Sequence, residues 1–566
     1  MSIAARIASS STAASPCKVT LLEKNSRAML GGRCGSFDVS VPGHDGAFRH
    51  ERGPSLLLLR SVYEDLFTDC TNGAKTAADF GLDIVQCAPA YQVVFDDGDR
   101  IELGFPEKDS EECIAKMNSY EEDGYAKWNE YMAACSAFLD CGLPNFIEER
   151  LDLPSFPAFI YEALRGGGVA WPLKPHSDVL DAIFASEKMK ALASFQDLYV
   201  GLEPYRNDDQ LFGGILKKTA PAVFGLLAAL ELHPTNKKAG VFAPIGGFRA
   251  VATAFERLCE DCGVEIRCDT TVVKVEDDGV HIKAGGTSDF IKVAADAVVI
   301  NADLPYATES LVGSTATSSA EDNAATGLKD TFDWDDRFDF SSGVVAFHWS
   351  LDVLCKDLNT HNVFLSASSQ NDTIQSWTAV RENIRTNMDA ADDVSFNFYV
   401  HRASKTDTTA APAGSDSIMV LVPCETLERK KELSSLERDE AISKYREQFS
   451  DDYVDQIRSA VLKRLGTIPS LQGLASNIID EVVDTPATYS DYYNVGGGVP
   501  FGLSHGFAQL SLTRPAPRYR RSKNTFFVGA STRPGNGVPL VLLGAKAIAG
   551  QVVSAVSQED GEIQKI

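Results

Sequence analysis

Near the carboxyl end of the chain, Gly529 to Pro539 read Gly-Ala-Ser-Thr-Arg-Pro-Gly-Asn-Gly-Val-Pro and follow the apolar run Thr525 to Val528. Leu540 to Val552, directly behind them, have the composition of an apolar helix. Glycine lets a backbone pass close to another group because it carries no Cβ. A strand, a turn rich in glycine and proline, and a helix together predict a backbone that runs very close to a flat ligand.

The amino-terminal residues have a complementary pattern. Met1 to Pro16 are rich in Ser and Ala and hold no acid, which is the composition of a transit peptide. We favour another interpretation, because Ser2 to Ala8 have the small residues of a helix that packs on a parallel sheet. Cys17 to Glu23 then form an apolar strand that ends in an acid. Helix, strand and acid are the second half of a dinucleotide-binding βαβ unit.

The first half of such a unit is a strand followed by a glycine-rich loop, and the acid lies about 20 residues after that loop. Counting back from Glu23 places the loop before Met1. A truncated gene model, an alternative start and a true loss of the loop all fit this count. We favour truncation, because the rest of the site is kept.

Gly31, Gly32 and Arg33 follow the acid after a short connection. The glycines allow a tight turn, and the planar guanidinium of the arginine can reach a phosphate or the edge of a ring. Alone this tripeptide is a common loop. At this distance behind a strand that ends in an acid, it indicates a binding site.

The composition excludes several classes of partner. The chain has 53 basic and 79 acidic residues in 566, a net charge of -26, which argues against nucleic acid as a ligand. Twelve cysteines without regular spacing favour reduced thiols over a disulfide framework. Cys259 and Cys262 form the one local pair, and we expect ordinary cysteines there and no metal site.

We find no apolar run that reaches the ~18 residues of a membrane span. Ala220 to Leu232, between the lysine pairs Lys217-Lys218 and Lys237-Lys238, is the nearest candidate. This segment could lie in a bilayer surface or form a buried core helix, and monotopic membrane contact stays possible.

Glu23, Gly31 to Arg33, Arg52 to Ser55 and Gly529 to Pro539 together resemble the FAD-dependent phytoene desaturase and carotenoid isomerase family of the amine oxidase superfamily. The closing motif is most similar to that of the bacterial and fungal phytoene desaturases. Further matches occur in the family's order at Phe242 to Phe248, Val298 to Asp303 and Phe501 to His505.

The resemblance implies that residues from three parts of the chain bind FAD. In the first part these are Glu23 at the ribose, Gly31, Gly32 and Arg33 along the diphosphate and flavin, and Pro54 and Ser55 beside the ring. In the centre it is Val272, whose backbone meets the adenine. In the last part these are Gly529 and Ala530 at the pyrophosphate and ribityl chain, and Gly535, Gly537, Val538 and Pro539 against the isoalloxazine. For Val272 and Pro54, packing alone is the alternative.

Arg533 stands where members of the family often carry His. A permanent cation replaces a titratable imidazole, so proton exchange by this residue is less natural than electrostatic stabilisation. We name Arg533 as the candidate catalytic residue in that role.

The resemblance also implies an α/β fold, with a discontinuous Rossmann-type FAD-binding domain that lacks its first strand and an α+β substrate domain. We expect the FAD-binding domain in residues 1–105, 240–319 and 461–566, and the substrate domain in residues 106–239 and 320–460. Aromatic side chains of the substrate domain could line a tunnel or pack in its core, namely Phe156, Phe159, Tyr161, Trp171, Phe195 and Tyr199.

The expected reaction is dehydrogenation of a long apolar polyene, with hydride transfer to the flavin. Alternatives are isomerisation or hydration of a carotenoid with reduced FAD, a carotenoid-binding protein that has lost FAD, and, more weakly, an amine oxidase. Quinone or oxygen would reoxidise the flavin. In a photosynthetic eukaryote we would expect a plastid protein associated with the membrane.

Overall fold

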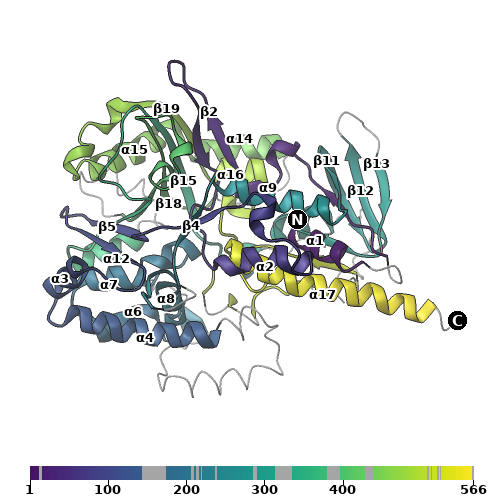
Figure 1. Cartoon of the computed structure of the whole chain (residues 1–566), viewed down its shortest axis with the longest axis horizontal. Coiled ribbons are helices and arrows are strands. Elements are labelled where there is room, and N and C mark those ends of the chain that lie inside the picture. Colours follow the sequence, from purple (N-terminus) through teal and green to yellow (C-terminus); the bar gives the residue numbers. More distant parts are fainter. Residues whose placement is uncertain are drawn as a thin grey trace.

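The computed structural model describes residues 1–11, 16–142, 174–205, 210–211, 216–217, 220–235, 239–284, 290–312, 334–378, 396–427, 438–506, 509–510, 513–518, 522 and 524–563. It has two parts side by side, one built on short parallel strand pairs and the other on a large mixed sheet (Figure 1). Both termini lie in the first part.

Segments far apart in sequence pair in the first part. Strand β1 (Thr20–Leu22) runs parallel to β10 (Glu265–Arg267), and β14 (Val298–Ile300) runs parallel to β20 (Thr525–Phe527). The expected amino-terminal helix is α1 (Ser2–Ser9). Parallel pairs covered by helices are the construction of a Rossmann-type domain, so the predicted α/β class is confirmed.

The two parallel pairs stay separate among the described residues. No described strand pairs with the second edge of β1. The second edge of β20 receives Pro517, whose carbonyl accepts a hydrogen bond from the Phe527 amide at 2.6 Å. Both edges line one cavity. This is where the expected first strand of the unit would lie.

Four of the described helices pack on these strands or on one another. Helix α9 (Phe248–Asp261) buries Val251, Phe255 and Leu258 against α1 and α2 (Arg60–Cys70). Helix α17 (Val538–Ile563) buries Ile548, which is 1% exposed, against α1 and β20. A three-stranded antiparallel ribbon completes this part with β11 (Thr270–Glu276), β12 (Gly279–Ala284) and β13 (Phe290–Ala294).

Helix α17 corrects one sequence expectation. Val538–Ser557 has a mean hydropathy of 1.7 and is long and apolar enough to cross a membrane. In its most apolar stretch, 39% of the residues are buried inside the protein. A count of strictly apolar residues misses it because Lys546 and Gln551 interrupt the run. Its packing on α1 and β20 explains the composition of its buried side.

The second part is built on a seven-stranded sheet in the order β19-β15-β18-β17-β16-β5-β6. Its strands are β5 (Tyr91–Phe95), β6 (Arg100–Leu103), β15 (Gly343–Leu351), β16 (His361–Leu365), β17 (Phe398–Arg402), β18 (Asp416–Cys424) and β19 (Ile478–Asp484). A hydrophobic core lies on each face of this sheet. Val93 and Phe95 of β5 belong to the core on one face, and Val94 belongs to the core on the other face. Successive side chains therefore fill opposite faces, as the period of a strand requires.

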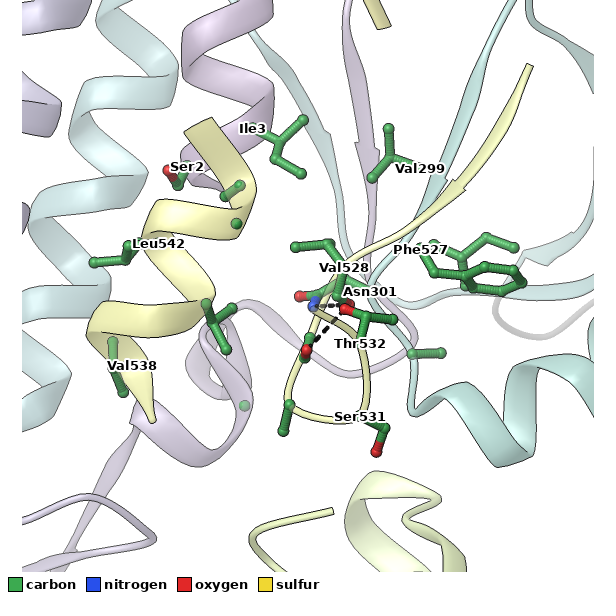
Figure 2. Close-up of a pocket in the computed structure, with 18 of the residues that line it drawn as sticks. Ser2, Ile3, Val299, Asn301, Phe527, Val528, Ser531, Thr532, Val538 and Leu542 are labelled. Atoms are coloured by element: carbon green, nitrogen blue, oxygen red, sulfur yellow. Dashed lines mark hydrogen bonds between the residues drawn. The ribbon is translucent and has the colours of Figure 1, made fainter. Parts of the chain in front are cut away.

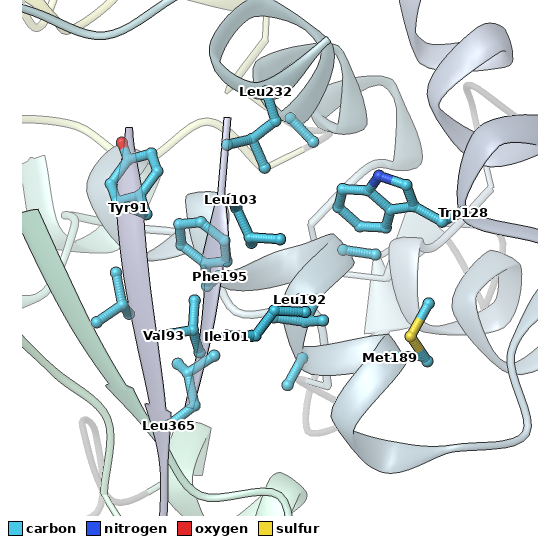
Figure 3. Close-up of a cluster of buried hydrophobic side chains, with 14 of the residues drawn as sticks. Tyr91, Val93, Ile101, Leu103, Trp128, Met189, Leu192, Phe195, Leu232 and Leu365 are labelled. Atoms are coloured by element: carbon cyan, nitrogen blue, oxygen red, sulfur yellow. The ribbon is translucent and has the colours of Figure 1, made fainter. Parts of the chain in front are cut away.

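Helices cover both faces of this sheet (Figure 1). One face carries α3 (Glu111–Tyr120), α4 (Gly124–Gly142), α6 (His176–Ile183), α7 (Glu187–Ser194) and α8 (Leu226–Leu232). Figure 3 shows Tyr91, Phe195 and Leu232 in the core between these helices and the sheet. The other face carries α15 (Asp451–Leu465).

The remaining elements are short connections between or beside these layers. They are β2 (Ser36–Val39), β3 (Phe48–Glu51), β4 (Ile84–Gln86), β7 (Gln210–Leu211), β8 (Leu216–Lys217), β9 (Phe242–Pro244), α10 (Leu304–Tyr306), α11 (Trp334–Arg337), α12 (Gln370–Thr378), α14 (Arg438–Gln448) and α16 (Pro486–Tyr493).

Sheet membership differs from the expected domain boundaries at two places. Strands β5 and β6 lie in residues 1–105 and β19 lies in residues 461–566, yet all three belong to the seven-stranded sheet. The seven-stranded sheet thus takes strands from both sides of the expected boundaries. Strand patterns alone do not say which sheet a strand joins.

Candidate active site

One cavity of about 1650 Å³ connects the two parts of the molecule. Pockets for single small ligands are about 300–1,000 Å³, so this cavity has room for more than one. Apart from Gly535, all the predicted site residues line it, and they are Glu23, Gly31, Gly32, Arg33, Pro54, Ser55, Val272, Gly529, Ala530, Arg533, Gly537, Val538 and Pro539.

The first wall of the cavity is the turn Gly31 to Arg33. Gly31 and Gly32 have φ of +103° and +58°, a region that favours glycine. A Cβ on Gly31 would lie 2.6 Å from the Cβ of Ala252 in α9, whereas a Cβ on Gly32 would meet no atom within 4 Å. Gly31 thus packs the turn on the helix, and Gly32 faces open space.

A second wall is the turn behind β20 (Figure 2). Thr532 closes it, because its amide and its Oγ1 both donate to the Gly529 carbonyl, at 3.2 and 3.0 Å. The Nδ2 of Asn301 donates to the Val528 carbonyl at 3.1 Å and ties the turn to the end of β14. Gly537 has φ of +93° and no atom within 4 Å of its would-be Cβ.

Arg514 organises this turn and was missed from the sequence. It is 1% exposed, and its guanidinium donates to five backbone carbonyls, those of Leu503, Ser504, Gln509, Ala530 and Thr532 at 2.6 to 3.3 Å. Burial lowers the pKa of Arg514 to about 9. Nothing in its local sequence, Thr-Arg-Pro, distinguishes it from a surface arginine.

Arg533 lines the cavity, half-buried, and its Nε donates to the Arg514 carbonyl at 3.0 Å. Its amide donates to the Pro515 carbonyl at 3.2 Å. These bonds hold the side chain at the cavity wall, and the catalytic role given to it above stays a prediction.

Gly535 is the predicted residue that the cavity does not include. It is buried against His505, and a Cβ there would lie 2.2 Å from the ring Nε2. That Nε2 accepts a hydrogen bond from the Asn536 amide at 3.3 Å. His505 lines the cavity and was quoted in a motif but not selected as a site residue.

Glu23 and Val272 come together at the far end of β1. The Oε1 of Glu23 accepts from the Asn25 amide at 2.9 Å, and the Glu23 carbonyl accepts from the Thr270 amide at 2.9 Å. The second bond attaches β11 to β1. The register of β11 shifts directly after Val272, so its backbone leaves the regular ladder beside the cavity.

Pro54 and Ser55 lie where the first part of the molecule meets the seven-stranded sheet. The Oγ of Ser55 is 2.9 Å from the hydroxyl of Tyr399 in β17, which is 2.6 Å from the Nδ1 of His361 in β16. Burial lowers the pKa of His361 well below its usual value, so the ring is neutral. Glu231 of α8 also lines this region and is 2% exposed.

An apolar wall continues the cavity away from the glycine turns. We define it by Leu58, Leu59, Phe138, Leu139, Leu226, Leu227 and Leu230. Ala228 to Leu232 of α8 are buried, so the structure supports the core helix for the segment Ala220 to Leu232. Phe195 is a core residue, Phe156, Phe159, Tyr161 and Trp171 lie outside the described residues, and so does the side chain of Tyr199.

The residues present fit FAD in two respects. Gly32 and Gly537 both line the cavity and leave open space where a side chain would stand, which lets a flat ring approach either backbone closely. Ser2, at the start of α1, lines the cavity with a buried hydroxyl that has no hydrogen-bond partner among the described residues. A helix start with a spare donor suits a phosphate.

Comparisons with known proteins agree with this geometry. A phytoene desaturase of Neurospora crassa is 29% identical over 574 residues, which cover 98% of this chain and 82% of that protein. A phytoene desaturase of Fusarium fujikuroi is 28% identical over 552 residues, covering 96% of this chain and 87% of that protein. No family model matches the chain.

Among solved structures, cyclohexylamine oxidase from Brevibacterium oxydans superposes with a TM-score of 0.53 at 12% identity, covering 99% of this chain and 97% of that one. At this identity the likeness concerns the fold alone. The relatives include fungal and bacterial proteins, so they give no support to the expected plastid location.

Proposed function

We propose that this chain, a phytoene desaturase-like oxidoreductase that depends on FAD, removes two hydrogens from a long apolar polyene. The observation that carries the proposal is that the glycine turns and the apolar wall belong to one cavity. A flat redox ring and an extended hydrocarbon can therefore meet without crossing water.

The bound FAD would accept a hydride, which is chemistry that side chains do not supply. Gly32 and Gly537 would face its ring system, Arg33 its diphosphate and flavin, and Ser2 a phosphate. The apolar wall would hold the polyene by burial and exclude water. Arg514 would keep the turn Gly529 to Asn536 in position.

Arg533 would stabilise negative charge that develops beside the ring. Its half-buried guanidinium keeps its charge at every working pH, and its Nε is fixed on the Arg514 carbonyl. Arg533→Lys would keep the charge but lose the planar fork, so we expect slower flavin reduction with unchanged FAD binding.

The test is to reconstitute the purified protein with FAD and supply phytoene in phosphatidylcholine vesicles without oxygen. We expect bleaching of the oxidised flavin and a product lighter by two hydrogens. A product of unchanged mass would establish an isomerase, and one heavier by water a hydratase. Failure to retain FAD would leave a polyene-binding protein.

We also propose peripheral membrane contact, because an apolar polyene partitions into bilayers and α17 offers a long apolar helix. Flotation with phosphatidylcholine vesicles tests this, and protein that stays at the bottom of the gradient would contradict it. The electron acceptor is identified by measuring reoxidation of the reduced flavin in two assays. One adds a quinone under anaerobic conditions, and the other supplies oxygen.

A further inference from the structure

Removing a hydride from a hydrocarbon leaves a neighbouring carbon that must lose a proton, so the site needs a base. Arg533 cannot be that base, because its guanidinium is always protonated. Four carboxyl residues among the described lining of the cavity can be compared, namely Glu23, Glu231, Asp296 and Asp303.

Three of these carboxyls are engaged or exposed. Glu23 accepts from the Asn25 amide at the ribose end, and Asp303 accepts from the Gly496 amide at 3.0 Å and from the Ser531 hydroxyl at 3.4 Å. Asp296 is exposed to solvent. His505 also lines the cavity, but its Nε2 already accepts from the Asn536 amide.

Glu231 differs from all of these. It is 2% exposed, lines the cavity, and its Oε2 is buried without a hydrogen-bond partner among the described residues. Leu227 and Leu230, on the same side of α8, belong to the apolar wall. The carboxyl therefore stands in the wall that would hold the hydrocarbon.

The surroundings of Glu231 support proton exchange. Burial raises the pKa of Glu231 to about 8, and its interactions with Tyr91 and Gln196 offset only part of the rise. Burial raises the pKa of Tyr399 well above its usual value, and the nearby charge of Glu231 contributes. The groups that face this region from β5, β16 and β17 are Tyr91, neutral His361 and Tyr399.

We infer that Glu231 is the base that takes the proton from the polyene, an inference that rests on the proposed function. One C–H bond breaks and its hydrogen leaves with both electrons for the oxidised flavin. The C–H bond of the adjacent carbon breaks, its electrons form the new double bond, and its proton moves to the Glu231 carboxylate. The substrate is oxidised by two electrons, the flavin is reduced, and the proton later leaves to solvent.

The experiment compares wild type with Glu231→Gln. Both proteins are loaded with FAD and supplied with phytoene in phosphatidylcholine vesicles, and the rate of flavin reduction is measured by stopped flow across a range of pH. We expect equal FAD and phytoene binding, a reduction rate about a hundredfold lower in the variant, and a pH profile that is flat there. In wild type the rate rises about tenfold per pH unit below pH 8, because only the carboxylate is active. An infrared carboxyl band that titrates near pH 8 in the flavin-free wild type and is absent from the variant gives a readout besides activity.

Two further variants serve as a control and as a substitute for Glu231→Gln. Asp109→Asn neutralises another buried carboxyl with a raised pKa outside the cavity lining, and should keep the wild-type rate and profile. If Glu231→Gln does not fold, Glu231→Asp takes its place, with a smaller loss of rate and a retained pH dependence. One outcome is a Glu231 variant that binds both ligands and reduces flavin at the wild-type rate and with the wild-type pH dependence. That result overturns the inference about Glu231 and leaves the proposed function standing. Absence of flavin reduction in wild type overturns the proposed function, and the inference falls with it.

Discussion

Gly537 and Gly43 have almost the same left-handed backbone, with φ of +93° and +91°, and neither has an atom within 4 Å of its would-be Cβ. Gly537 lines the cavity and Gly43 does not. We expect alanine at either site to cost about 1 kcal/mol of unfolding free energy, because an L side chain is strained there. Only Gly537→Ala should also weaken FAD binding, by tenfold or more, about 1.4 kcal/mol.

Thermal unfolding and FAD titration of the two variants separate strain from contact with the cofactor. Equal FAD affinity in Gly537→Ala and Gly43→Ala would show that the turn behind β20 does not approach the ring.

Arg514→Met removes a charged donor from five backbone carbonyls, two of them in the carboxyl-terminal turn and three in the segment Leu503 to Gln509. Buried acceptors that lose a charged donor are costly, so we expect a loss of about 3–5 kcal/mol in unfolding free energy. Urea denaturation measures it. Arg446→Met, which removes a mostly exposed ion pair with Asp491, is the matched control and should cost at most about 1 kcal/mol. Similar losses in both would refute the organising role of Arg514.

The sequence could predict glycine positions better than the roles of charged residues. Gly31, Gly32 and Gly537 are needed for their backbone conformation, which their position in turn motifs signals directly. Arg514 and Glu231 matter because they are buried, and burial depends on how separate segments pack together in the folded chain. No local pattern could select them.

At the scale of elements, α8 carries a carboxyl into an apolar wall, and this has a consequence for stability. The folded pKa of Glu231 is about 8, above its ordinary value of 4.5, so the folded protein binds this proton more tightly than the unfolded chain. Stability from this group is therefore present below pH 4.5 and is lost as the pH rises to about 8, by up to about 1.4 kcal/mol per pH unit.

Glu231→Gln removes that titration. We expect the unfolding free energy of the variant to rise relative to that of wild type steadily between pH 5 and 8, and the difference to level off above pH 8. Glu51 titrates with the same sign but is present in both proteins, so it cancels in the difference. Glu64→Gln, at an exposed site, is the control. Parallel curves for wild type and Glu231→Gln would mean that the carboxyl is not desolvated.

The elements themselves were predictable where the chain is locally regular. The helix within Ser2 to Ala8, the strand before Glu23 and the helix behind Pro539 are confirmed, because apolar spacing and glycine punctuation define them. The membership of β5, β6 and β19 in the seven-stranded sheet could not be predicted, because an alternating strand pattern fits either sheet.

At the scale of the whole molecule, three segments converge on one cavity: Gly31 to Arg33, the start of β11 at Val272, and Gly529 to Pro539. These segments are far apart along the chain. Composition and spacing could therefore suggest a flat ligand at each segment, but only the family resemblance indicated that the three segments bind the same ligand. No described strand pairs with the second edge of β1, and this edge lines the cavity.

Hydrogen–deuterium exchange with and without saturating FAD tests this convergence directly. We predict that FAD slows exchange at all three segments together, while the exposed turn around Gly43 is unchanged. Protection at one segment alone, or none despite bound FAD, would contradict the claim that these distant turns enclose a single flavin.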